Sequence, residues 1–572
     1  MKLLFERAVT FALGGPSGDD RLDGVIECAV SIGADGRRWS MAISNDTASA
    51  VAVRRVGWVV PLETSGPARM FCNGYQSWSP TGMATLGVDR DPSQTDSFLE
   101  VFGAALHADQ RQSVGDELRS EAVTVLADGG QEIALVGFLG GDHHDGTLRL
   151  RTGLAGPELL IEAFLGGAHL PAGGQRVLHD VSIEVGDTGD HSRLLDDWAT
   201  AVGSAAAART AAHYQVGWCS WYHYFHQIDE VALDSNLALS ADWPFEVFQL
   251  DDGYQRSIGD WLVTNDSFDS PLDVLADRIA AAGRRPGIWL APFAMHPSYE
   301  MFDRHPDWLA TTTDGAGPVP VMIQDIWDGV AYGLDTTHPE VIEHLEGVAR
   351  SLRDAGFSYL KLDFTYAPSF DGIYRDPTMT PAERVRAGYN AIRRGAGDDA
   401  FILGCGAPLG SLVGVVDAMR IGPDVAPNWE VDPGHIHLQG YDETAPSTRN
   451  AWQSTLARSF MHRRLWLNDP DCIMLRTADT NLAPESARAW ALAVAQSGGM
   501  ALVSDDLALL GADERALLDE VIAIGRAVDD AIVAGGAAPT VPDLMDARTP
   551  TTLVAGGRSL IGDPVSGTAT LT

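Results

Sequence analysis

The sequence predicts a multidomain α/β protein with an N-terminal β-sandwich, a central (β/α)8 barrel and a small C-terminal β-domain. Three observations carry this prediction. Short apolar runs separated by turn residues fill roughly the first 190 residues, which is typical of a sandwich. Eight apolar strands then alternate with amphipathic helical stretches, as in a parallel barrel. A long helical pattern and a segment rich in Gly, Thr and Pro end the chain.

The N-terminal sandwich is expected to span residues 1–191. Turn signals such as Ala127-Asp128-Gly129-Gly130 separate its short runs. An Ala-rich helical pattern over residues 192–213 then predicts a linker helix. The expected strands are 2–11, 24–32, 39–43, 50–58, 121–126, 132–138 and 148–151.

The barrel is expected to span residues 214–510, and a helix with a small β-domain residues 511–572. The expected barrel strands are 216–221, 247–251, 287–292, 359–363, 401–405, 418–421, 465–469 and 500–504. Helices are expected between most of them, at 272–282, 339–355, 381–394, 447–463 and 487–497.

The composition is that of a folded, soluble protein. Hydrophobic residues make up 45% of the chain and charged residues 21%, with a mean hydropathy of −0.04, which excludes a disordered or collagen-like chain. The 40 Lys and Arg residues against 78 Asp and Glu residues give a net charge of −38. Because so acidic a surface repels phosphate backbones and anionic lipids, neither nucleic acid nor membrane is an expected partner.

Cysteine spacing and the N-terminus give no sign of secretion. The five cysteines lie far apart and form no C-x-x-C pair, which argues against a disulfide framework or a structural zinc site. The first apolar run stops at Glu6 and Arg7, well short of a secretory signal. No apolar stretch reaches the length of about 18 residues that a membrane span needs, so the cytoplasm is the expected location.

Carboxylates and aromatic residues occupy the ends of the expected barrel strands, where the following loops carry the chemistry of such barrels. In YLKLDF, Lys361 and Asp363 share one face of the strand, because side chains alternate along it. The neighbouring ammonium favours the ionised acid, which is the state that a carboxylate nucleophile needs. Asp363 is therefore a candidate nucleophile, with a structural ion pair as the alternative.

A second acid follows the sixth expected strand. In AMRIGPDVAPNW, Gly422-Pro423 ends the strand and leaves Asp424 on a loop above the barrel, where an aromatic neighbour such as Trp429 would raise its pKa. The alternative is an ordinary turn aspartate beside proline. Asp363 and Asp424 together supply the carboxylate pair of most glycoside hydrolyses. A separation of about 5 to 6 Å predicts retention of the anomeric configuration, and about 6.5 to 9.5 Å predicts inversion.

Further carboxylates occur at Asp251-Asp252 and Asp469-Pro470-Asp471. Paired acids of this kind also bind Mg²⁺ or Ca²⁺. No histidine accompanies them in zinc-like spacing, however, and aspartate is equally suited to accept hydrogen bonds from sugar hydroxyls. We therefore expect a sugar site without metal or cofactor. The aromatic residues after the first barrel strand suit the flat face of a pyranose, although Trp218 or Phe225 is expected in the core.

Five motifs follow one another along the barrel: LDDGYQ, RPGIWLAPF, KLDF, GCG with RIGPD, and NDPD. Together they resemble the family-36 glycoside hydrolases, the α-galactosidase or melibiase group, over about residues 214–505. The resemblance implies an N-terminal β-supersandwich, a central barrel and a C-terminal β-domain, in relatives that are often dimers or tetramers. It also implies a retaining, metal-free double displacement with Asp363 as nucleophile and Asp424 as acid/base.

The resemblance further assigns contacts with the sugar hydroxyls. Asp251 and Asp252 would hold the O4 and O6 hydroxyls of galactose, and Lys361 would bind O3 or O4. Arg420 and Asp471 would flank the O2 and O3 side.

Three more residues complete the implied sugar site. Trp221 and Trp289 would line it or stack on the sugar, and Cys405 would form a wall near O2. The implied substrate is an α-galactoside oligosaccharide, such as raffinose or melibiose, from which a terminal galactosyl residue is removed.

Departures from the family pattern keep other functions open. Thr365-Tyr366-Ala367 follow KLDF where many bacterial members carry Asn-Arg, GCGAP replaces Cys-Ser-Gly-Gly, and the chain is shorter. The alternatives are an α-N-acetylgalactosaminidase or another α-glycosidase, and a raffinose-synthase-like α-galactosyltransferase. A non-catalytic sugar-binding protein would be expected to lack one of the two acids.

The segment NGYQSWS at residues 73–79, here called the 73–79 loop, is unusually aromatic for a loop. We expect it to lean over the barrel mouth or over a neighbouring subunit's site. A hydrophobic plug between sandwich and barrel is the alternative.

Overall fold

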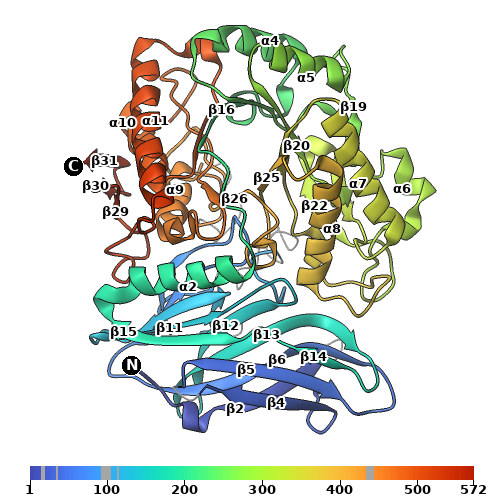
Figure 1. Ribbon diagram of the computed structural model, residues 1–572, viewed down its shortest axis with the longest axis vertical. Coiled ribbons are helices and arrows are strands. Elements are labelled where there is room, and N and C mark those ends of the chain that lie inside the picture. The colour runs from blue at the N-terminus through green and yellow to red at the C-terminus, as the bar shows by residue number, and fades with distance from the viewer. Residues whose placement is uncertain (15–19, 34–35, 92–104, 112–114, 433–442) are drawn as a thin grey trace.

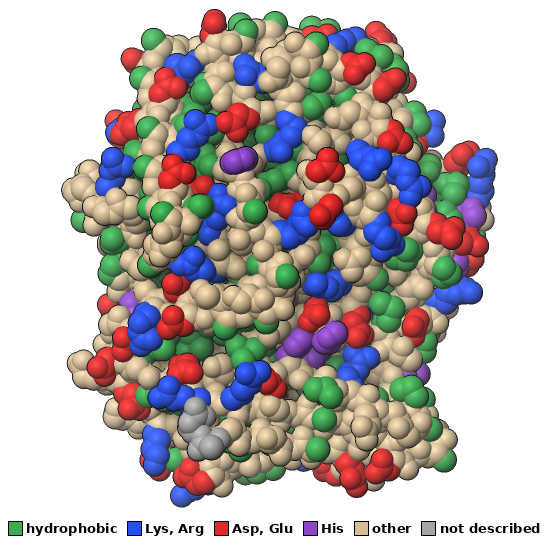
Figure 2. Space-filling model, viewed as in Figure 1, with side chains coloured by type: hydrophobic (Ala, Val, Ile, Leu, Met, Phe, Trp, Pro, Cys, Tyr) green, Lys and Arg blue, Asp and Glu red, His purple; other side chains and the backbone are tan. Residues whose placement is uncertain are grey.

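The computed structural model describes residues 1–14, 20–33, 36–91, 105–111, 115–432 and 443–572. Two antiparallel sheets form the N-terminal part, the helix-surrounded barrel lies beside them, and the last strands of the chain lie at the flank of the barrel (Figure 1). This arrangement confirms the predicted fold class. On the face seen in Figure 2, acidic and basic side chains are interspersed.

The two sandwich sheets bury alternate side chains of their strands. In β5 (Arg38–Asn45), for example, Trp39, Met41 and Ile43 are buried, which is the period of a half-buried strand. Within the described residues, one sheet has the order β3-β2-β6-β13-β12-β9 with β1 beside β6, and the other β14-β5-β15-β11-β10-β7-β8 with β4 beside β5. The bounds are β1 Lys2–Leu3, β2 Val9–Gly14, β3 Asp20–Arg21, β4 Ile26–Ile32, β6 Val51–Glu63, β7 Arg69–Cys72, β8 Gly82–Thr85, β9 Leu118–Glu121, β10 Val123–Ala127, β11 Glu132–Phe138, β12 Asp145–Gly153, β13 Gly156–Leu170, β14 Gln175–Val177 and β15 Val181–Asp187.

Two of the expected sandwich strands are interrupted, and six strands of the described residues were not predicted: β3, β7, β8, β13, β14 and β15. The expected strand 2–11 is broken by the short helix η1 (Phe5–Arg7), and the expected strand 121–126 is divided at Ala122, which has a φ of 64°. The long strand β13 escaped prediction because Gly166-Gly167 and its glutamates interrupt the apolar alternation; its pairing with β6 shifts register at those glycines.

Eight parallel strands form a nearly closed barrel in the described part of the chain, in the order β27-β26-β25-β24-β20-β17-β16-β28. Each expected barrel strand is present, and Trp218 stacks on Phe248 with ring centroids 4.2 Å apart. An isolated bridge between Ile473 and Val503 links the two ends of the sheet. The bounds are β16 Gln215–Cys219, β17 Val247–Leu250, β20 Arg285–Leu290, β24 Tyr359–Leu362, β25 Phe401–Gly404, β26 Ala418–Arg420, β27 Leu467–Asp469 and β28 Met500–Val503.

Helices surround the barrel, and their ends follow local signals. Helix α8 begins with a capping box between Thr380 and Glu383, while α10 ends before Gly498, whose φ is 76°. The helix expected over 447–463 is shorter, because α9 ends at Ala457 and the short helix η11 (Ser459–Met461) follows. The helix bounds are α3 Trp221–Tyr224, α4 Glu230–Leu239, α5 Leu272–Ala281, α6 Glu300–Arg304, α7 Pro339–Asp354, α8 Pro381–Ala396, α9 Thr448–Ala457, α10 Pro484–Ser497 and α11 Ala512–Val533. None of the helices in the described residues combines the length and apolarity needed to cross a membrane.

Two small sheets that the sequence did not predict interrupt the strand–helix alternation near the barrel mouth. Strands β18 (Gln255–Ser257) and β19 (Asp260–Thr264) form a hairpin after β17. Between β20 and α7, strands β21 (Ala294–Met295), β22 (Pro320–Gln324) and β23 (Gly329–Gly333) form a sheet of their own.

Helix α2 (His191–Ala205) joins the sandwich to the barrel (Figure 1). Its Trp198 donates from Nε1 to the Phe138 carbonyl at 2.9 Å on the sandwich side, and its ring lies 6.3 Å from that of Phe460 on the barrel side. Strands β29 (Thr552–Ala555), β30 (Arg558–Asp563) and β31 (Thr568–Leu571) form the C-terminal sheet.

Candidate active site

Aspartates follow or end four barrel strands, so the fold brings them to the same end of the barrel, where such barrels carry their sites. Their charges also act on one another. The charge of Asp363 contributes to raising the pKa of both Asp252 and Asp424. The aspartates are Asp251 and Asp252 after β17, Asp363 after β24, Asp424 beyond β26, and Asp469 and Asp471 at the end of β27.

Asp363 is held by a hydrogen-bond donor on each carboxylate oxygen. Trp289 donates from Nε1 at 3.0 Å, and the backbone N–H of Phe364 donates at 2.8 Å. Phe364 has a φ of 52°, so the chain turns sharply directly after the acid. The Asp363 side chain is thus fixed in orientation at the end of β24. Trp289 itself is buried, with only 1% of it exposed.

Asp424 lies on the loop after β26, and its side chain is 32% exposed. Burial of the carboxyl group raises its pKa; the Arg420 guanidinium, 3.0 Å away, acts in the opposite direction, and the charge of Asp363 raises the pKa further. The suggested aromatic neighbour, Trp429, is not the cause. Its Nε1 donates to the Pro564 carbonyl at 2.8 Å and its ring packs against Trp452, so it anchors the C-terminal segment.

Arg420 gathers three carboxylates around one guanidinium. It contacts Asp424 at 3.0 Å, Asp469 at 3.0 Å and Asp471 at 2.7 Å, and only 2% of its side chain is exposed. Burial raises the pKa of Asp471 to about 7 despite the neighbouring cation. The Tyr222 hydroxyl donates to the same Asp471 carboxylate, a contact between two sites far apart in the sequence.

Lys361 forms a second buried ion pair, with Asp251 at 2.9 Å. Burial acts to lower the pKa of Lys361, but the Asp251 carboxylate outweighs it and holds the pKa well above its usual value. Gln249 donates to the same oxygen of Asp251 at 2.5 Å. Cys405 is fully buried nearby, and burial followed by the charge of Asp363 raises the pKa of its thiol.

Asp252 contacts a residue that sequence reasoning missed. Trp327, in the short helix η7 (Asp325–Trp327) between β22 and β23, donates from Nε1 to Asp252 at 2.9 Å. Gln255 donates to the other oxygen at 2.5 Å. Burial nevertheless raises the pKa of Asp252 to about 7. The signal available in the sequence was a tryptophan in the segment between two strand ends that carry aspartates, those of Asp252 and Asp363.

The aromatic residues after β16 divide between core and mouth. Trp218 is fully buried, which confirms the expectation that Trp218 or Phe225 lies in the core, whereas Phe225 is 38% exposed. Phe225 instead has a φ of 49° and packs edge-on against the half-buried Trp221 at 5.4 Å. The turned backbone directs the ring out of the core.

The 73–79 loop reaches the barrel of its own chain beside Asp363. The Trp78 ring packs edge-on against Phe364 at 5.1 Å and against Tyr366 at 6.0 Å, both of which follow the acid. Trp78 is only partly buried. The other six residues of the loop are buried, so the alternative of a plug between sandwich and barrel describes most of it, and Trp78 alone is partly open to solvent, at the end of its own barrel.

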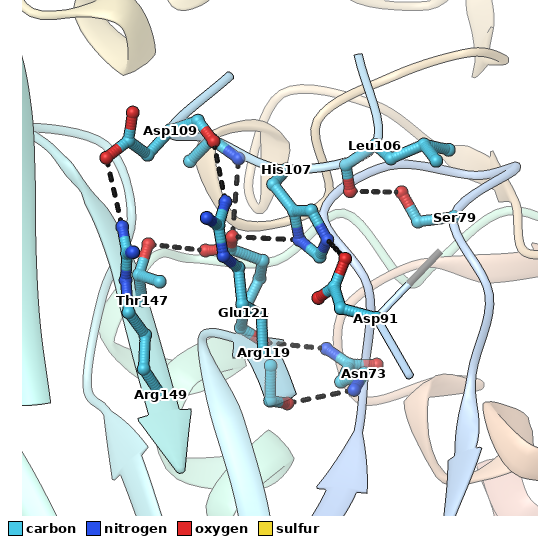
Figure 3. Close-up of polar contacts among 12 residues, drawn as sticks. Asn73, Ser79, Asp91, Leu106, His107, Asp109, Arg119, Glu121, Thr147 and Arg149 are labelled. Carbon is cyan, nitrogen blue, oxygen red and sulfur yellow. Dashed lines mark hydrogen bonds and ion pairs between the residues drawn. The ribbon is translucent and has the colours of Figure 1, made fainter. Parts of the chain in front are cut away.

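The other side of the 73–79 loop is tied to the sandwich (Figure 3). Asn73 donates from Nδ2 to the Glu121 carbonyl at 3.0 Å, and the Ser79 hydroxyl donates to the Leu106 carbonyl at 2.8 Å. Next to Leu106, His107 lies 3.0 Å from Asp91 and 3.6 Å from the Glu121 carboxylate. The loop is therefore anchored on both sides.

Comparison with known proteins places these features in a family context. The family model for melibiase matches residues 215–373. The α-galactosidase AgaA of Geobacillus stearothermophilus is 29% identical over 96 residues, covering 16% of this chain and 13% of the relative. The myogenesis-regulating glycosidase of Mus musculus is 32% identical over 171 residues, covering 25% of this chain and 22% of the relative. In each case the matched part spans less than a quarter of the relative.

Solved structures extend the similarity to the whole chain. TtGalA, an α-galactosidase from Thermus thermophilus solved with p-nitrophenyl α-D-galactopyranoside, has a TM-score of 0.70 and 26% identity, covering 94% of this chain and 99% of that one. The family-36 α-galactosidase AgaA from Geobacillus stearothermophilus shares the fold, with a TM-score of 0.59, 13% identity and coverage of 98% and 78%. Sequence motifs, family model and whole-chain fold agree, and the chain is a relative of the family-36 glycoside hydrolases.

Proposed function

We propose that the protein is a retaining exo-α-galactosidase that removes terminal α-D-galactosyl residues from oligosaccharides. The observation that carries the proposal is the contrast between two acids in one site. Asp363 accepts a hydrogen bond on each oxygen, which suits an ionised carboxylate. Asp424 has a raised pKa, which suits a proton donor. Most retaining glycosidases use one ionised carboxylate as the nucleophile and one protonated carboxylic acid as the proton donor.

In the proposed reaction, Asp363 attacks the anomeric carbon while Asp424 gives its proton to the departing glycosidic oxygen. A covalent galactosyl ester of Asp363 forms and the aglycone leaves with the proton. Asp424, now ionised, removes a proton from water, which attacks the anomeric carbon and releases Asp363. Two inversions give net retention of the α-configuration.

The surrounding side chains suit a polyhydroxylated sugar. The ion pairs of Lys361 with Asp251 and of Arg420 with Asp471 place fixed donors and acceptors beside the two acids. We infer that Asp251, Asp252 and Lys361 bind one side of galactose. Arg420, Asp471 and Cys405 would then bind the O2 side, with Trp221 and Trp289 as walls.

The choice of galactose draws on the relatives. TtGalA has been solved with p-nitrophenyl α-D-galactopyranoside and with stachyose, and an AgaA variant with raffinose. An α-linked galactosyl oligosaccharide is accordingly the substrate class proposed for this chain.

A substrate panel tests the proposed activity. Aryl α-galactoside, α-N-acetylgalactosaminide and α-glucoside would be offered to the wild-type protein together with raffinose. We expect hydrolysis of the galactosides alone. Cleavage of the N-acetylgalactosaminide instead would change the glycone. Transfer of galactose to added sucrose in preference to water would identify a transferase.

The Trp78→Ala variant tests the role of the 73–79 loop. Losing an aromatic contact worth about 0.5–1.5 kcal/mol is expected to raise KM for raffinose about 2- to 13-fold. The aryl galactoside, with its smaller aglycone, should be less affected. Trp243→Ala is the matched control, because Trp243 is also half-buried and stacks on an aromatic ring, that of Phe245. Unchanged KM and kcat in Trp78→Ala would show that the loop takes no part in substrate binding.

A further inference from the structure

Arg458 directly follows helix α9 and is fully buried. Its guanidinium donates to four backbone carbonyl groups. One terminal nitrogen reaches Ser77 and Ile421, each at 2.8 Å, and the other reaches Ser79 at 3.1 Å and Gln76 at 3.4 Å. None of its recorded partners in the described residues is a carboxylate. Burial alone lowers the pKa of Arg458 to about 9.

A buried cation held only by carbonyl groups is costly for a fold, because the desolvation of its charge is repaid by dipoles alone. An apolar side chain would fill such a site more cheaply if packing were all that was required. What the guanidinium provides is a planar fork that bonds two chain segments at once.

The first of these segments is the 73–79 loop. Gln76, Ser77 and Ser79, whose carbonyl groups Arg458 holds, flank Trp78 on both sides. The loop passes so close to the guanidinium that a Cβ added at Gly74 would lie 2.7 Å from an Arg458 nitrogen. Arg458 thereby sets the position from which Trp78 contacts Phe364.

The second segment carries Asp424. Ile421 is the residue before Gly422-Pro423-Asp424, and its N–H donates to the Asp469 carbonyl at 3.0 Å while its carbonyl accepts from Arg458. The turn that projects Asp424 therefore starts from a residue fixed on both sides. The same guanidinium holds this turn and the 73–79 loop.

We propose that Arg458 is a positioning residue that couples the placement of the 73–79 loop to the placement of Asp424. The kinetic consequence of this coupling rests on the proposed function. The loop would contact the leaving group, and Asp424 would give that group its proton. Because Arg458 holds both segments, greater mobility of one segment would increase the mobility of the other.

Hydrogen exchange tests the coupling without any substrate. In Arg458→Met, deuterium uptake is expected to rise together in the peptides covering residues 73–79 and 420–426, with a smaller rise in Arg458→Lys, which keeps the charge but not the fork. Arg284→Met is the matched control, since Arg284 also donates to three carbonyl groups, those of Phe245, Ser240 and Trp243, before β20 at the opposite end of the barrel. A rise in only one of the two peptides, or in neither, overturns the proposal.

Gly74→Ala approaches the same coupling from the loop side and covers the case that Arg458→Met does not fold. The added methyl group would press on the Arg458 nitrogen and on Ser79. Uptake at residues 420–426 is expected to rise although Gly74 lies outside that segment. Unchanged uptake there would contradict the coupling.

Kinetics supply the functional readout. Because an oligosaccharide needs protonation of its leaving group and a nitrophenol does not, Arg458→Lys is expected to lose about 10-fold more kcat/KM on raffinose than on the aryl galactoside. A variant that was merely less folded would lose both equally, and that result would reject a positioning role. Wild-type protein inactive on both substrates would refute the proposed function, while the exchange experiment would still decide the coupling.

Discussion

Replacing Asp363 with Asn is expected to reduce kcat/KM for an aryl α-galactoside by about 10⁴-fold or more, because the amide cannot form the covalent intermediate. The effect should appear in kcat even with a good leaving group, since the first step itself is lost. The fold should be retained, because the amide oxygen can still accept from Trp289 or from the Phe364 N–H. Steady-state kinetics with circular dichroism would measure both.

The control for this experiment is Asp354→Asn, which makes the same chemical change at an exposed carboxylate at the end of α7. It should leave kcat and KM unchanged. Asp363→Asn with wild-type activity would mean that another residue is the nucleophile.

Replacing Asp424 with Asn is expected to cost about 10²- to 10⁴-fold in kcat/KM for raffinose, the usual contribution of a general acid. The loss should be much smaller for an aryl galactoside whose leaving group departs without a proton. Added azide should then restore turnover of the aryl substrate and yield α-galactosyl azide, because azide needs no general base. An equal loss on both substrates would argue against the acid/base role.

The pH profile follows from the sign of the Asp424 shift. Burial raises the pKa of Asp424, so its proton is retained above the ordinary range of an aspartic acid and is lost as the pH rises through the shifted value. The wild-type kcat/KM for raffinose should therefore fall on a basic limb that lies above that ordinary range. In Asp424→Asn this limb should disappear, and a limb that persisted unchanged would belong to another group.

The barrel strands and the positions of Asp363 and Asp424 beyond the strand ends could be predicted because their signals are local. Most barrel strands are short apolar runs followed within three residues by Gly, Pro or a carboxylate, and parallel strands place those ends on one side. Asp363 and Asp424 thus follow from counting strands. The strand β13 and the division of a sandwich strand at Ala122 escaped because one depends on a register shift and the other on a single backbone angle.

The contacts that tune the site could not be predicted, because they join segments distant in the sequence. Trp327 reaches Asp252 from a sheet inserted after β20, and Tyr222 reaches Asp471 across 249 positions. Trp429 shows the converse: it is close to Asp424 in sequence, yet it packs against the C-terminal sheet segment. Arg458 meets the 73–79 loop across about 380 residues, a distance at which sequence spacing carries no information.

Trapping the covalent intermediate tests the central claim most directly. An activated fluorinated α-galactoside forms the galactosyl ester rapidly, but this ester is hydrolysed slowly and therefore accumulates. The labelled residue can then be found by proteolysis and mass spectrometry. The account predicts one galactosyl label on the peptide that contains Asp363, and none in Asp363→Asn. A label on another carboxylate, or turnover without a label and with the β-anomer released first, would contradict it.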